Sequence, residues 1–169
     1  MGTRKVEKAT AIIVALTVTT LSFVHINDWE AVGICTSCQL SGRLLYPFFH
    51  AGTLHAVLNV WCLLSIVFIH EVSCLRLLFA YVAAVTVPVG TLGTFLPLDC
   101  PTVGLSGVVY VLFGSISFEV LRKRYYQCWM LFYIGIGFLM PNTNAWLHLY
   151  CYLCGFVFAL LNKPIYRKR

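Results

Sequence analysis

Long runs of hydrophobic residues, separated by short polar segments, fill most of the chain. Six of these runs approach the length of a helix that crosses a bilayer, which takes about 20 residues for about 30 Å of hydrocarbon. They cover residues 9–26, 48–69, 75–96, 104–121, 125–140 and 145–161. The pattern therefore predicts an all-α, polytopic membrane protein built as a bundle of six transmembrane helices.

Proline, glycine and asparagine residues interrupt this pattern at two informative places. Pro88, Gly90 and Gly93 fall inside the third run, where they weaken the helix and predict a kink or a loosened outer end. Asn144 stands directly before the sixth run. We expect its side chain to cap the helix that follows.

The composition agrees with a single membrane domain. Of the 169 residues, 60% are hydrophobic and 11% are charged, which is more apolar surface than a small soluble globule can bury. We expect a membrane domain at residues 9–162, flanked by a short basic cytosolic N-terminus at residues 1–8 and a basic cytosolic tail at residues 163–169. The apolar run near the N-terminus is expected to stay in the protein as a helix.

The net charge of +6 indicates topology. It does not indicate nucleic-acid binding, because so apolar a chain offers little water-exposed surface for a basic patch. If both termini are cytosolic, all 12 Lys and Arg residues except Arg43 fall on the cytosolic side, as the positive-inside rule requires. The second, fourth and sixth helices then begin on the extracytoplasmic side, and residues early in each lie at the same depth.

Most of the 8 cysteines lie inside hydrophobic runs, where cysteine acts as a small buried hydrophobe. Cys35, Cys38 and Cys100 fall in expected outer loops. A CxxC pair can be a redox centre, half of a zinc site or a local disulfide, and no second ligand pair follows at zinc spacing. A structural disulfide or two free thiols are favoured, and loop cysteines favour an oxidising compartment outside the cytosol. We therefore expect an endomembrane or plasma-membrane protein.

Polar residues stand out in the early turns of the second, fourth and sixth helices. They are His55, Asn59, Ser106 and His148. Polar residues inside a membrane helix usually face the bundle interior and are functional candidates, with a structural hydrogen bond between helices as the alternative. Small residues that permit a close approach of the fourth and sixth helices are Gly104, Gly107, Gly114 and Gly155.

A serine and a histidine at the same depth suggest nucleophilic catalysis. A serine hydroxyl becomes a nucleophile when a base takes its proton, and histidine is suited to that role. No carboxylate lies at this depth, so we predict a Ser106–His148 dyad, with Tyr110 one turn below the serine to orient the imidazole. The oxyanion needs preorganised donors, for which the Ser106 N–H and the side chains of His55 and Asn59 are available. No metal or other cofactor is implied.

These motifs resemble those of the rhomboid intramembrane serine proteases. The segment GLSGVVYVLFG at residues 104–114 is similar to the nucleophile segment of bacterial rhomboids. The spacing of His50, His55 and Asn59 resembles the pattern in their second helix, and His148 occupies the place of their sixth-helix base. The resemblance covers about residues 43–161.

The resemblance implies a function for each of these residues. Ser106 would be the nucleophile and His148 the base, while His55 and Asn59 would line the oxyanion hole. We expect His50 to brace the first loop. The implied partners are the lipid bilayer and transmembrane protein substrates, cut near their outer ends by an active site that faces the extracytoplasmic side.

Two positions beside the predicted base depart from the rhomboid pattern, which has Ala directly before it and Gly three residues after it. Here these positions hold Leu147 and Cys151, whose larger side chains are expected to push the sixth helix from the fourth and lengthen the Ser106–His148 hydrogen bond. The alternative is a catalytically weak or inactive rhomboid-like pseudoprotease that binds and escorts membrane proteins. A small channel or carrier is less favoured, because the polar residues cluster in the outer half of the bundle.

Overall fold

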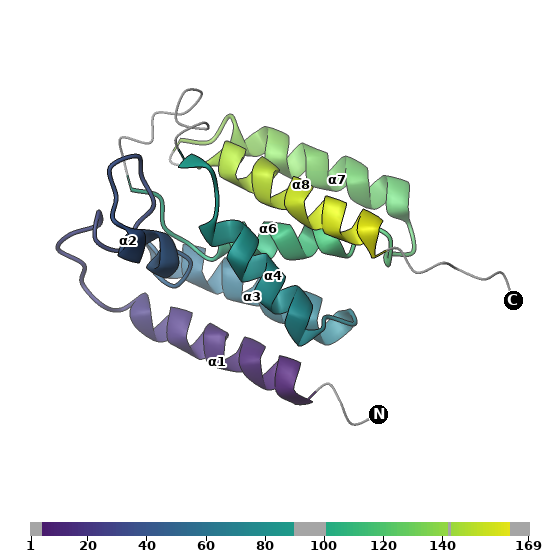
Figure 1. Cartoon of the computed structure of the whole chain (residues 1–169), viewed down its shortest axis with the longest axis horizontal. Helices are drawn as coiled ribbons and strands as arrows, with labels where there is room; N and C mark the ends of the chain where they lie inside the picture. The colour runs from purple at the N-terminus through teal and green to yellow at the C-terminus, as the bar shows by residue number, and fades with distance from the viewer. Residues whose placement is uncertain (1–4, 90–100, 142, 163–169) are drawn as a thin grey trace, which may run out of the picture.

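The computed structural model describes residues 5–89, 101–141 and 143–162, and these residues form an all-helical bundle (Figure 1). The helices are α1 (Lys5–Leu21), α2 (Leu40–Leu45), α3 (Thr53–Ile69), α4 (Cys74–Val85), α6 (Ser106–Ser115), α7 (Lys123–Gly137) and α8 (Ala145–Leu161). An isolated β-bridge joins Ile34 to Thr102. The predicted all-α class is confirmed.

Helix α6 lies at the centre of the bundle, between α3 and α4 on one side and α8 on the other (Figure 1). Eight of its residues are buried, because its sequence is apolar around the whole circumference and a helix of that kind belongs in a core. Helix α1 packs mainly on α3, and α7 packs on α8. Helix α6 is therefore the element on which α3, α4 and α8 all pack.

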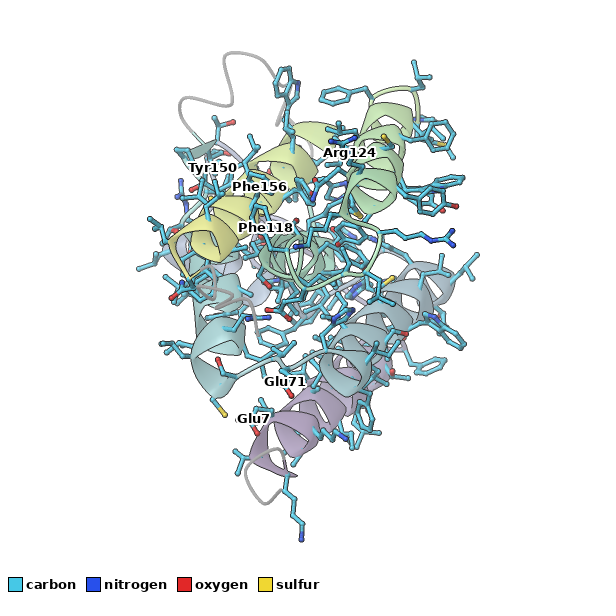
Figure 2. All side chains as sticks on the ribbon, turned by 90° about the vertical axis from the view of Figure 1, so that its right-hand side faces the viewer. Glu7, Glu71, Phe118, Arg124, Tyr150 and Phe156 are labelled. Carbon is cyan, nitrogen blue, oxygen red and sulfur yellow. A yellow bond between two sulfur atoms is a disulfide. The ribbon has the colours of Figure 1, made fainter. Side chains whose placement is uncertain are left out.

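The most extensive helix contact is between α6 and α8, and two glycines make it possible. A Cβ atom added at Gly155 would overlap the carbonyl oxygen of Val111, and one added at Gly114 would overlap the carbonyl oxygen of Tyr152. The two backbones therefore touch, which small residues allow. Beyond this contact the ring centroids of Phe118 and Phe156 lie 5.3 Å apart (Figure 2).

Helices α3, α6 and α8 all begin at one end of the bundle, beside α2, while α1, α4 and α7 run in the opposite direction (Figure 1). The first turns of α3, α6 and α8 therefore come together. This is the end at which the sequence places the predicted polar residues.

Several helix boundaries differ from the prediction. Helix α1 covers residues 5–21 and α7 covers residues 123–137, both shifted towards the N-terminus, whereas α8 covers the predicted residues 145–161. Helix α3 begins at Thr53, five residues later than expected, because the chain is extended at Gly52. Helix α2 was not predicted.

Two predicted helices are shorter than their hydrophobic runs. Helix α4 ends at Val85, because Pro88 has no backbone N–H and disfavours a helical conformation in the residue before it. Helix α6 ends at Ser115, and Ser117 then donates its N–H to the carbonyl of Gly114, three residues earlier. Such tighter bonds are common where a helix ends.

Some predictions fall outside the described residues: Gly90, Gly93 and Cys100, and the basic tail at residues 163–169. Cys35 and Cys38 form a disulfide in the loop before α2, which is one of the two states favoured by the sequence. Within the described ranges, no helix has the combined length and apolar character needed to cross a membrane.

The α6–α8 contact predicts different effects for two glycine substitutions. Gly155→Ala should lower the melting temperature of the detergent-purified protein by several degrees, because the new methyl group overlaps backbone that cannot move aside, and overpacking of this kind costs about 1–3 kcal/mol. Gly135→Ala on α7 is the control, since nothing lies within 4 Å of its added Cβ. Thermal unfolding followed by circular dichroism measures both, and equal melting temperatures would contradict the close approach.

Candidate active site

Ser106 is the first residue of α6, and the turn before it depends on a glycine. Gly104 has a φ of +133°, a conformation that glycine adopts readily and other residues rarely do. A Cβ atom at this position would also lie 2.9 Å from Cε1 of His55. The glycine therefore sets the direction in which the chain enters α6 and lets the His55 ring lie against the turn.

His148 lies in the first turn of α8, and its Nε2 is 2.9 Å from the Oγ of Ser106. The start of α8 is held by Asn144, whose Oδ1 accepts the N–H of Leu147 at 3.0 Å. The predicted cap is confirmed. Two residues separated by 42 positions in the sequence are therefore brought to hydrogen-bond distance.

The ring of Tyr110, one turn after Ser106 on α6, stacks on the imidazole of His148. Their centroids are 4.3 Å apart, and their planes differ by 15°. This contact fixes the plane of the imidazole while its Nε2 reaches Ser106. The arrangement is the one expected if Tyr110 orients the histidine.

His50 connects α3 to the turn before Ser106. Its Nε2 accepts the backbone N–H of Leu105 at 3.1 Å and also lies 3.3 Å from Nδ2 of Asn59. Asn59 Nδ2 in turn donates to the carbonyl oxygen of His55 at 3.0 Å, and the rings of His50 and His55 meet edge to face at 5.0 Å. His50 is thus bonded to the residue that precedes the serine, a connection that the sequence did not predict.

The backbone at the start of α6 also favours negative charge near Ser106. The first four N–H groups of a helix have no partner within the helix, and the helix dipole places partial positive charge at this end. Ser106 is the first helical residue. A charge that develops next to its Oγ would therefore form where the backbone stabilises an anion.

The expectation that Leu147 and Cys151 lengthen the Ser106–His148 hydrogen bond is wrong. Leu147 is 2% exposed and Cys151 is fully buried, yet the bond measures 2.9 Å. The two helices stay close because their backbones touch at Gly114 and Gly155. Cys151 lies opposite Gly107 on α6, where an added Cβ would be in ordinary contact, 3.5 Å from the Cys151 Sγ.

Tyr46 and Thr102 support the site without having been singled out by the sequence. The carbonyl of Tyr46 accepts the N–H of Gly104 at 2.8 Å, and its hydroxyl donates to the carbonyl of Ala84 at 2.9 Å. The Oγ1 of Thr102 accepts the Nδ2 of Asn144 at 3.1 Å. Both residues lie in loops without periodic pattern, so their partners are set only by the fold.

A family model described as the Rhomboid domain matches residues 37–164. Comparison with curated proteins and with solved structures finds no match. The matched range runs from just before α2 to beyond the end of α8, and it includes both Ser106 and His148. Because it spans well over half of the chain, the protein belongs to the rhomboid family of membrane proteins.

Proposed function

We propose that the protein is an intramembrane serine endopeptidase that cleaves transmembrane segments of membrane proteins. The observation that carries the proposal is the 2.9 Å contact between Ser106 Oγ and His148 Nε2 at the N-terminal end of the central helix. A nucleophile and its base must lie within this reach for the proton to be transferred. Membership of the rhomboid family supports the same reaction.

In this reaction His148 takes the hydroxyl proton as Ser106 attacks the scissile carbonyl carbon. The tetrahedral intermediate collapses as His148 returns the proton to the leaving amine, which leaves an acyl ester on Ser106. Water, activated by the same histidine, then attacks the ester, and the proton passes back to the serine oxygen as the acid product leaves. The stacked ring of Tyr110 keeps the imidazole in one plane through these steps.

We assign the oxyanion hole to the backbone N–H of Ser106 and the side chains of His55 and Asn59. The position of His55 against Gly104 supports this assignment. The amide of Asn59 has two contacts, and the longer one goes to His50 Nε2, which already accepts the N–H of Leu105. Asn59 can exchange that weaker contact for the oxyanion, since the bond from Leu105 remains for His50.

We further propose six transmembrane helices with both termini in the cytosol and the catalytic end facing the extracytoplasmic side of an endomembrane or plasma membrane. Large hydrophobic side chains are exposed on the outer faces of the helices, with Trp61 at 72%, Leu78 at 59%, Leu131 at 61% and Leu153 at 50%. Lipid is the solvent that suits such surfaces. Glu7 and Arg124 lie at the opposite end, where α1 and α7 begin (Figure 2).

The alternative function is a rhomboid-like pseudoprotease that binds and escorts membrane proteins. One observation favours it: an amide has two hydrogens to donate, and the Nδ2 of Asn59 already contacts the His55 carbonyl oxygen and His50 Nε2. If those contacts persist when substrate binds, the oxyanion lacks this donor. Removing one such donor typically lowers the rate by about 100-fold or more.

An activated serine should react with a fluorophosphonate probe. We expect the detergent-purified wild type to be labelled, Ser106→Ala to show no adduct, and His148→Ala to be labelled at least about 100-fold more slowly, the usual contribution of a positioned base. Intact-mass spectrometry measures the adduct. Matching melting temperatures for the three proteins would show that the variants remain folded.

The labelling result separates the two candidate functions. A folded wild type that stays unlabelled, while an active rhomboid protease labels in parallel, would contradict the protease proposal and favour the pseudoprotease. Equal labelling of wild type and His148→Ala would contradict the dyad, because the serine would then be reactive without the proposed base.

Replacing Cys151 by glycine tests whether crowding limits the reaction. We expect Cys151→Gly to leave the labelling rate unchanged or to lower it, because the Ser106–His148 distance is already 2.9 Å and the substitution removes a fully buried side chain. Time courses of probe labelling measure the rate. A clear gain in rate would mean that Cys151 does hold the helices apart.

The stacking contact predicts different effects for two replacements of Tyr110. Tyr110→Phe keeps the ring against His148 and should label at close to the wild-type rate. Tyr110→Leu removes it and should slow labelling by up to about tenfold, because an aromatic pair contributes about 0.5–1.5 kcal/mol. Equal rates for the two variants would show that the stack does not orient the imidazole.

A further inference from the structure

We propose that Thr102 and Asn144 are positioning residues for His148, acting through the hydrogen bond between their side chains. The inference rests on the proposed function, since it concerns how the base of that reaction is held. The bond runs from Asn144 Nδ2 to Thr102 Oγ1 at 3.1 Å. It connects the segment that leads into Ser106 with the residue that begins the helix of His148.

The backbone of Thr102 is held in place by residues outside α8. Its N–H donates to the carbonyl of Ile34 at 3.0 Å, and its own carbonyl accepts the N–H of Ile34 at 2.9 Å. Ile34 is 1% exposed and directly precedes the disulfide between Cys35 and Cys38. The hydroxyl of Thr102 is therefore presented from a loop that is held by two backbone bonds and a nearby covalent link.

Asn144 transmits this fixed position to the first turn of α8. Its Nδ2 donates to Thr102, while its Oδ1 accepts the N–H of Leu147 at 3.0 Å. Leu147 is the residue before His148, so one amide side chain joins the loop to the backbone next to the base. Both polar side-chain atoms of Asn144, Nδ2 and Oδ1, take part in this connection.

This end of α8 needs such a connection because the tight helix contact lies elsewhere. The backbone contact at Gly155 is seven residues beyond His148, which is about 10 Å along the helix. A first helical turn carries N–H groups without helical partners and opens more easily than the middle. A displacement of about 1 Å in a catalytic group can lower the rate by about 100-fold. The position of the first turn of α8, which carries His148, would therefore affect the rate of the proposed reaction.

Two substitutions of Thr102 separate a hydrogen-bonding role from a packing role. Thr102→Val keeps the shape and removes the acceptor, whereas Thr102→Ser keeps the acceptor and removes a methyl group. We expect fluorophosphonate labelling of Ser106 to slow by about tenfold or more in Thr102→Val and to stay near the wild-type rate in Thr102→Ser. A packing role would produce the opposite order, with the serine variant slower, and would overturn the inference.

Asn144→Ser completes the test, because a serine can still cap α8 but is too short to reach Thr102. It should slow labelling as Thr102→Val does. The double variant should be no slower than either single one, since both remove the same bond. Additive effects would show that the two residues act separately and would contradict the proposed connection.

Amide hydrogen exchange of residues 145–150 gives a readout that does not need activity. Exchange should be faster in Thr102→Val than in wild type and unchanged in Thr102→Ser. If the wild type is not labelled at all, the proposed function fails, and exchange alone decides whether the bond holds the turn of His148. Equal exchange in all three proteins would overturn the inference, whatever the labelling shows.

Discussion

The backbone contact between α6 and α8 is the constraint on which the rest of the structure depends. It exists because Gly114 and Gly155 have no side chains where the two helices meet. Packing interactions fall off steeply with separation, so this contact fixes the relative position of the two helices where they meet and brings their N-terminal ends near each other. With the pair fixed, Ser106 and His148 at their N-terminal ends come within 2.9 Å. The proximity of Ser106 and His148 thus depends on apolar packing farther along the same helices.

At the end of the bundle that carries the site, hydrogen bonds hold the backbone in position. The segment before Ser106 is held by four backbone groups, each bonded to a residue from another segment: the N–H and carbonyl of Thr102 and the N–H groups of Gly104 and Leu105. Hydrogen bonds suit this role because they are directional, so they set the orientation of a turn that has few side chains to pack. The N-terminus of α6 lies at this turn, and its first N–H groups are the donors that the proposed oxyanion hole would use.

The residues beside His148 show that side-chain size in the sequence does not by itself give the distance between two helices. Leu147 and Cys151 are larger than the residues of the rhomboid pattern that the sequence resembles, and on sequence grounds they were expected to separate the helices. The helices nevertheless touch at Gly114 and Gly155, and the Ser106–His148 distance is 2.9 Å. The separation of two helices therefore depends on their whole contact and not on one or two side chains.

The sequence by itself determined the helical class and the family, and it singled out the residues of the candidate site. Hydrophobic runs of this length favour helices over strands. Ser106, His148, His55 and Asn59 were recognisable because polar residues are costly in apolar segments. The limits of α3, α4 and α6 were not determined, because a hydrophobic run does not show where the backbone leaves the helix. Only the tertiary structure decided that His50 bonds to Leu105 and Asn144 to Thr102. Those pairs join segments about 40 or more residues apart, and no local pattern records a contact that forms when the helices pack.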